Sequence, residues 1–306
     1  MHKNENERTE RTHAMKMHYA DYKTILSPSN GMNIYRGCTH GCIYCDSRSA
    51  CYRMEHDFED VEVKRDAPRI LEDQLKRRRN PCMIGTGAMC DPYNHADEEL
   101  QMTRQCLSVI ERCGFGVSVL TKSARIMRDM DILKAINRKT KCVVQITLTT
   151  YDEELCRKIE PNVSTTFERF QVLKAMNEAG IPAVVWLCPT LPFINDSEEN
   201  LRGLLGYCVE AKVRGILCFG FGVTLREGDR EYFYRALDSL FPGVKERYIE
   251  TFGDSYVCDS PNNVRLTEIF REVCKEHNIL YKTDEVFGYL RQFETKSRQS
   301  ALSEHY

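Results

Sequence analysis

The sequence lacks a long apolar segment and an excess of charge of either sign, and it contains a single tryptophan, Trp186. No apolar run approaches the ~18 residues that a membrane-spanning helix needs. The first eight residues are polar and charged, unlike a secretory signal. The 306 residues include 43 basic and 45 acidic side chains, a formal net charge of −2. We therefore expect a cytoplasmic protein without membrane association, for which a nucleic-acid partner is possible but not favoured.

The sequence also lacks two common binding signatures. A second C-x2-C pair, which most structural zinc sites need, does not occur. A dinucleotide-binding glycine fingerprint is missing as well, because the Gly-Thr-Gly of residues 85–87 is too short. Cysteine, in contrast, is abundant at 15 residues. In a reducing cytoplasm we expect most of these cysteines to be small buried apolar residues.

Three of the cysteines, Cys38, Cys42 and Cys45, have the spacing C-x3-C-x2-C within one short segment. Three thiolates from so short a loop can reach three corners of one iron–sulfur cubane. The fourth iron would then have no ligand from this loop, and an open iron is typical of a catalytic cluster. Gly37 and Gly41 allow the backbone to fold tightly around such a group.

Two other interpretations of these cysteines were weighed. His40 or Cys51 could complete a zinc site or a closed cluster. A disulfide would leave one of the three cysteines unpaired. The spacing favours the open cluster over both alternatives.

The wider run at residues 33–45, N-x-Y-R-G-C-x-H-G-C-x-Y-C, resembles the radical S-adenosylmethionine (radical SAM) signature, in the branch that contains spore photoproduct lyase. The resemblance implies a [4Fe–4S] cluster that binds S-adenosylmethionine and cleaves it reductively to a 5′-deoxyadenosyl radical. It also implies an external one-electron donor of the flavodoxin or ferredoxin type. The chemistry itself would belong to the cofactors.

Strand-like and helix-like segments alternate through most of the chain, which predicts an α/β fold with a parallel sheet. Six such units are too few for a closed eight-fold barrel. A partial (β/α)6 TIM-like barrel fits the count and is also what the resemblance implies, whereas an open doubly wound sheet is the alternative. The strands are expected at residues 32–35, 82–87, 117–121, 142–149, 181–188 and 216–220.

We expect three regions: an N-terminal arm at residues 1–27, the barrel at 28–240 and a C-terminal accessory segment at 241–306, polar from residue 295. Residues 47–66 are charged and show no regular pattern. Residues 100–113 are expected to form one helix. A capping box at residues 165–168 predicts another helix, whose apolar side chains recur every three residues at Phe167, Phe170, Leu173 and Met176.

In parallel barrels the chemistry lies where the strands end. Besides the cysteine loop, this rule selects Asp91, Lys122 and Thr147. The resemblance, which extends over residues 30–195, implies that Asp91 holds the methionine amino group, Lys122 its carboxylate, and that the Thr147 hydroxyl assists. Tyr44 can lay its ring against a planar ligand group.

Each of these residues also has a plain structural interpretation. Asp91 precedes a proline and could initiate a turn, Lys122 could lie on the surface, and Thr147 could be an ordinary strand residue. Glu160 could simply pair with a basic neighbour such as Arg169.

The resemblance also argues against the lyase itself. That enzyme uses a cysteine as hydrogen donor at the position matched by Ala88, so Cys90 is the nearby candidate for a radical role. The sequence does not select a substrate. DNA photoproduct repair is one alternative function, and a non-enzymatic, metal-bound nucleic-acid-binding module is another.

Overall fold

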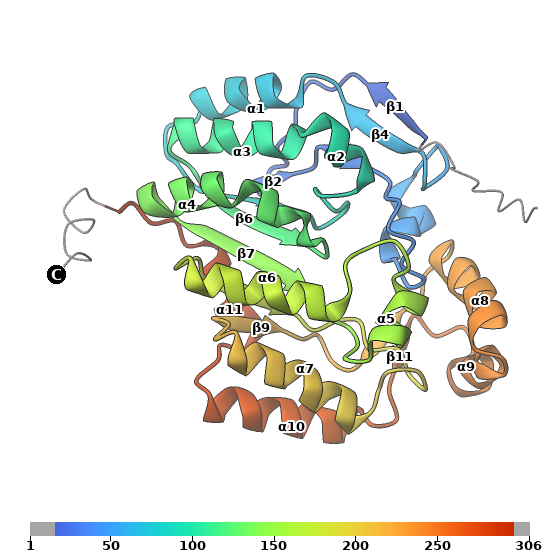
Figure 1. Cartoon of the computed structure of the whole chain (residues 1–306). Helices are drawn as coiled ribbons and strands as arrows, with labels where there is room; N and C mark the ends of the chain where they lie inside the picture. The colour runs from blue at the N-terminus through green and yellow to red at the C-terminus, as the bar shows by residue number, and fades with distance from the viewer. Residues whose placement is uncertain (1–15, 297–306) are drawn as a thin grey trace, which may run out of the picture.

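A six-stranded parallel sheet forms the centre of the fold in the computed structural model, which describes residues 16–296 (Figure 1). Its strands follow one another in the sheet in chain order, and every neighbouring pair is parallel. An open doubly wound sheet would instead reverse its strand order at a switch point. The predicted partial (β/α)6 barrel is therefore confirmed. The strands are β2 Gly31–Met32, β5 Met83–Thr86, β6 Gly116–Thr121, β7 Cys142–Thr147, β8 Ala183–Trp186 and β9 Gly215–Leu217.

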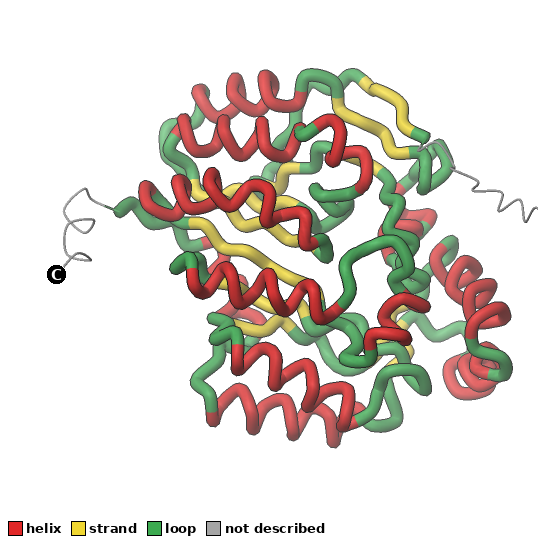
Figure 2. The backbone as a smooth tube through the Cα atoms, in the orientation of Figure 1, coloured by secondary structure: helices red, strands yellow, loops and turns green. Residues whose placement is uncertain are grey.

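Helices cover the outer face of this sheet, as Figure 2 shows in red against the yellow strands. Apolar side chains of the strands and helices form one large buried core between the two layers. The helices of this layer are α1 Ala67–Lys76, α3 Met102–Cys113, α4 Met130–Lys139, α6 Thr166–Glu178, α7 Glu198–Glu210 and α10 Asn263–Glu276. No helix within residues 16–296 is long and apolar enough to cross a membrane.

The capping box that predicted α6 is confirmed. The Thr165 side chain accepts a hydrogen bond from the Glu168 backbone N–H, and the Glu168 carboxylate accepts one from the Thr165 N–H. The apolar spacing along α6 was less informative, because Phe167 is 48% exposed. Steps of three residues fall short of the 3.6-residue turn, so Phe167 drifts off the buried face and lies beside Tyr207 at the surface.

Two expectations from sequence were wrong. The region 47–66 is not irregular throughout, because Val61–Lys64 forms strand β4 between β1 (Met17–Ala20) and β3 (Tyr35–Arg36). The helix expected at 100–113 is interrupted at Gln101, whose φ of 48° ends α2 (His95–Leu100) before α3 begins. Both features depend on contacts or backbone conformations that local sequence patterns do not encode.

The part of the chain after β9 packs on both sides of the barrel. The helix α11 (Thr283–Arg291) covers the inner face, where Val286 and Leu290 contact Val143 and Leu217.

The predicted boundaries at residues 27 and 240 stay predictions. Residues 1–15 and 297–306, part of the predicted arm and polar tail, lie outside the described residues. The remaining elements are β10 Gly222–Thr224, β11 Val257–Asp259, α5 Glu153–Ile159, α8 Asp229–Leu240, α9 Val244–Phe252, and the short 3-10 helices Asp46–Arg48, Ala50–Tyr52 and Ala124–Asp129.

Candidate active site

The cysteine loop turns on its two glycines, as the sequence predicted. Gly37 has a φ of +83° and Gly41 a φ of +71°, conformations that L side chains rarely adopt. A Cβ atom on Gly37 would lie 2.5 Å from the carbonyl oxygen of Phe58. The loop can therefore approach the backbone at Phe58 this closely only with glycine at position 37.

Backbone hydrogen bonds from two other segments hold the loop in place. The Cys38 N–H donates to the Phe58 carbonyl at 2.9 Å, and the Ile43 N–H donates to the Ile159 carbonyl at 3.0 Å. From the turn that follows α5, the Asn162 N–H donates to the His40 carbonyl at 3.1 Å. The cysteines are thus presented by a loop that is fixed along its whole length.

The sulfur atoms of Cys38, Cys42 and Cys45 do not all lie close together in the structure. Among the described residues, only one group brings three His, Cys, Asp or Glu ligand atoms within 4.8 Å of one another, and it contains no cysteine. Sulfur ligands of one tetrahedral zinc would lie about 3.8 Å apart, given bonds of ~2.3 Å. At least one pair of the three cysteine sulfurs is therefore farther apart than 4.8 Å in the structure, whereas a cubane offers separate corners.

The residues that could have supplied a fourth ligand take different positions. Cys51 is exposed, and its sulfur accepts a hydrogen bond from Arg226. The His40 ring is buried with its Nδ1 3.6 Å from Asp91, while its Nε2 atom is buried without a hydrogen-bond partner. Burial raises the pKa of Cys42 and of Cys45, so a metal must displace their protons when it binds.

A cavity opens beside the cysteine loop at the carboxyl ends of the strands. Among the described residues, Lys122 is the single basic one that lines it, and Asp46 and Asp259 are the acidic ones. Lys122 follows β6, and although burial opposes its charge, the neighbouring Cys42 and Glu160 raise its pKa. A half-buried ammonium group therefore stands next to the cysteine loop. The cavity is further lined by Cys42, Tyr44, Cys45, Tyr52, Ala88, Met89, Trp186, Cys188, Phe219 and Val257.

Tyr44 belongs to a buried polar network beneath this cavity. Its hydroxyl donates to the carboxylate of Glu160, which also forms an ion pair with Arg169 at 2.5 Å. Both side chains of the pair are fully buried. Burial alone would raise the pKa of Glu160, but Arg169 and Lys122 hold it below its ordinary value. The expected pairing of Glu160 with Arg169 is confirmed, and sequence reasoning missed the link to Tyr44.

Asp91 is engaged by the protein itself. Its carboxylate accepts hydrogen bonds from the Thr121 hydroxyl at 2.7 Å and from the backbone N–H groups of Lys122 at 2.8 Å and Tyr93 at 2.9 Å. It is not among the residues that line the cavity. Its contact with the methionine amino group stays a prediction. In the structure, the hydrogen bonds of the Asp91 carboxylate connect the turn after β5 with the turn after β6.

Thr147 and Cys90 also lie outside the cavity lining. Thr147 is buried at the end of β7, on the inner face that it shares with Val143, because strand side chains alternate. The Cys90 thiol donates to the Gly37 carbonyl at 2.7 Å, so it packs behind the cysteine loop. Cys188, at the end of β8, is the additional cysteine that does line the cavity.

The cavity residues that sequence reasoning did not select as ligands include Met89, Trp186, Cys188 and Phe219. Each lies at or just beyond the end of a strand, so the rule that chemistry follows strand ends applied to them as well. Because these side chains are mostly apolar, nothing in the sequence separately indicated that they line a binding cavity. Phe219, 57% exposed, and Trp186 form an edge-on aromatic pair at the cavity.

Comparison with known proteins shows the family of this chain and supports the same fold. The family model of the Radical SAM superfamily matches residues 32–205. This range includes the cysteine loop and the strand-end residues Asp91, Lys122 and Thr147. The chain belongs to the radical SAM superfamily. It is therefore an enzyme, and the alternative of a non-enzymatic binding module is excluded.

Relatives of this radical SAM enzyme occur in bacteria and archaea. An uncharacterized protein of Mycobacterium tuberculosis is 30% identical over 229 residues, 72% of this chain and 66% of that protein. One of Methanocaldococcus jannaschii is 29% identical over 169 residues, 55% of this chain and 62% of the relative. The chain thus matches just under two thirds of the length of each.

Solved structures of spore photoproduct lyase share the fold. The lyase complexed with dinucleoside spore photoproduct has a TM-score of 0.62 at 12% identity, covering 87% of this chain and 81% of that one. A lyase variant with bound S-adenosylmethionine has a TM-score of 0.59 at 13% identity, covering 81% of this chain and 74% of the lyase. At these identities the likeness concerns the fold.

Proposed function

We propose that this radical SAM enzyme holds a [4Fe–4S] cluster through Cys38, Cys42 and Cys45 and cleaves S-adenosylmethionine reductively, producing a 5′-deoxyadenosyl radical that attacks a further substrate. The observation that carries the proposal is the position of Cys42 and Cys45, which line one cavity together with Lys122. Family membership supports the two cofactors in general. When bound, the reduced cluster would supply one electron to the sulfonium of S-adenosylmethionine, whose carbon–sulfur bond would then break.

The chain's own contribution is to bind and orient. The Lys122 side chain is half-buried and lies close enough to Cys42 for that group to raise its pKa. There it can hold a carboxylate by a charge-assisted hydrogen bond. Tyr44 is fixed by Glu160, which is itself fixed by Arg169. These contacts pre-order one wall of the cavity, so the protein does not reorganise when the cofactor enters.

The cavity favours a substrate other than a long DNA duplex. Two carboxylates and one lysine line it, whereas DNA binding depends on neutralising many phosphates. Ala88 also lines the cavity in place of a hydrogen-donating cysteine. An aromatic or apolar group fits better, because Trp186 and Phe219 offer exposed ring surface there. We propose a flavodoxin- or ferredoxin-type protein as the electron donor.

The experiment that tests the pocket is the replacement Lys122→Met, a side chain of similar length without charge. Loss of one charge-assisted contact costs about 1.5–3 kcal/mol, so we expect S-adenosylmethionine affinity to fall about 10- to 150-fold. Iron content should not change, because Lys122 is not a ligand. Equilibrium binding to anaerobic, cluster-loaded protein measures the affinity, and elemental analysis of the same samples measures the iron content.

Lys134→Met is the matched control, since Lys134 is an exposed lysine on α4. Its affinity should equal that of the unaltered protein. Equal affinity in the Lys122 variant as well would show that the cofactor binds elsewhere.

A further inference from the structure

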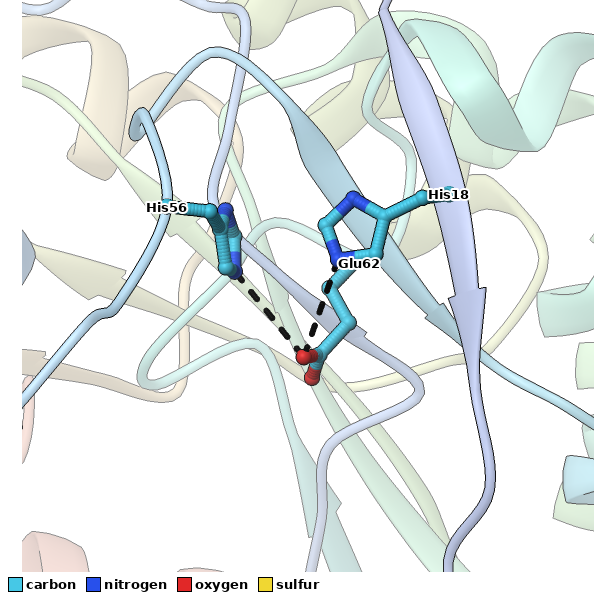
Figure 3. Close-up of side chains that lie close together, drawn as sticks. All are labelled: His18, His56 and Glu62. Atoms are coloured by element: carbon cyan, nitrogen blue, oxygen red, sulfur yellow. Dashed lines mark ion pairs between the residues drawn. The ribbon is translucent and has the colours of Figure 1, made fainter.

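Three polar side chains converge outside the candidate active site, on the small β1–β4–β3 sheet (Figure 3). His18 on β1 and Glu62 on β4 are direct partners in the parallel register of these strands. His56 reaches the same point from residues 54–60, here called the 54–60 loop, which leads into β4. The ligand atoms of all three lie within 4.8 Å of one another.

Both histidines present the same ring nitrogen to the carboxylate. The Nε2 atoms of His18 and of His56 each lie 3.9 Å from Oε2 of Glu62 (Figure 3). Ligand atoms of a tetrahedral zinc ion with ~2.1 Å bonds are about 3.4 Å apart. Shortening each of these nitrogen–oxygen distances by about half an ångström would therefore bring both pairs to the separation found around zinc.

Neighbouring acceptors fix the tautomer of each ring. Nδ1 of His18 lies 3.0 Å from the Asp60 carboxylate, and Nδ1 of His56 lies 3.0 Å from the Asp57 carbonyl oxygen. Neither oxygen can donate a hydrogen bond, so each Nδ1 carries the proton. The lone pair is then on Nε2, which faces Glu62. Metal-ligating histidines are usually held by such an acceptor on their other nitrogen.

The carboxylate is oriented in the same way. The Tyr22 hydroxyl donates to Oε1 of Glu62 at 2.6 Å, which leaves Oε2 facing the histidines. Arg36 is the register partner of Glu62 on β3, but its guanidinium donates to the carbonyl oxygens of Tyr52 and Arg53. The ammonium of Lys64 lies over the Tyr22 ring.

One atom of the group is left without a partner. Nε2 of His56 is buried and has no hydrogen bond, a costly state that native structures usually avoid. The His18 side chain is 40% exposed, so an ion can enter from that side. Two imidazoles and a carboxylate, each held by a second partner, form the N2O donor set of zinc sites that keep an open fourth position.

We propose that His18, His56 and Glu62 bind one zinc ion. The ion joins β1 to β4 and to the 54–60 loop, since His18 lies 38 residues before His56 and 44 residues before Glu62. The same loop supplies the Phe58 carbonyl that accepts from Cys38. Zinc here therefore fastens the loop on which the first cluster cysteine rests. The site does not depend on the proposed S-adenosylmethionine chemistry.

The test is zinc retention by the full chain, loaded anaerobically with its cluster, equilibrated with zinc and dialysed. We expect one zinc per chain by elemental analysis. His56→Gln and Glu62→Gln should each weaken zinc binding at least 100-fold, and Tyr22→Phe, which removes only a supporting contact, about 10- to 100-fold. His277→Gln, at an exposed histidine after α10, is the matched control and should keep its zinc.

A second sample separates this site from the cluster loop. In the triple variant Cys38→Ala/Cys42→Ala/Cys45→Ala, the zinc site should remain at one ion per chain, and cobalt(II) bound there should show no thiolate charge-transfer absorption. The proposal is overturned by zinc that disappears with the cysteines, by zinc unaffected by His56→Gln and Glu62→Gln, or by binding of iron(II) or manganese(II) without zinc.

Discussion

Replacing Cys42 with alanine is expected to abolish the iron–sulfur cluster. Protein prepared anaerobically should contain about four irons and four sulfides per chain, and the variant should contain only background amounts of both. The physical reason is that a cubane bound by three cysteines loses one of its three protein ligands with each replacement. Iron and sulfide analysis, together with the visible spectrum, measures the effect.

Cys51→Ala is the matched control for this experiment. Cys51 lies only six residues beyond Cys45, but it is exposed and bonded to Arg226. We expect its iron and sulfide contents to equal those of the unaltered protein. A loss as large as that of Cys42→Ala would mean a closed, four-cysteine site, and stoichiometric zinc without sulfide in the native protein would contradict the cluster altogether.

Replacing Arg169 with methionine is expected to destabilise the fold by about 3–5 kcal/mol, because it leaves the Glu160 carboxylate buried without its ion-pair partner. Both side chains are fully buried, so water cannot replace the lost contact. The Arg169 guanidinium also donates to the carbonyl oxygens of Thr147 and Ser164. Urea unfolding of the metal-free protein measures the change in free energy.

Two further variants make the test specific. Lys174→Met, on the same helix, breaks an exposed ion pair with Glu210 and should cost about 1 kcal/mol or less. The double variant Arg169→Met/Glu160→Gln removes the stranded charge and should recover part of the loss. Equal effects of Arg169→Met and Lys174→Met would show that the buried pair is not the main support of this region.

The features predicted correctly are those that local sequence encodes. The cysteine loop lies within residues 33–45, and its two glycines take the positive φ angles that the pattern required. From β5 to β8 each strand is a short apolar run followed by a helix, so this repeat predicted the parallel order. The positions of Asp91, Lys122 and Thr147 at strand ends followed from the predicted fold alone.

The features that were missed arise from contacts between distant residues. Strand β4 has charged residues at alternate positions and becomes a strand through its pairing with β1 and β3. The same pairing brings His18 to Glu62, which no spacing rule could indicate. Asp91 lies just after a strand end, as predicted. Only the structure shows that its carboxylate accepts hydrogen bonds from the Thr121 hydroxyl and the Lys122 backbone N–H.

The most direct test of the central claim is the fate of S-adenosylmethionine. Cluster-loaded protein is reduced with dithionite under anaerobic conditions, and the products are quantified by mass spectrometry, with the Cys42→Ala variant in parallel. The account predicts equal amounts of 5′-deoxyadenosine and methionine from the intact protein and none from the variant. Intact S-adenosylmethionine in both samples, despite a full complement of iron and sulfide in the intact protein, would contradict it.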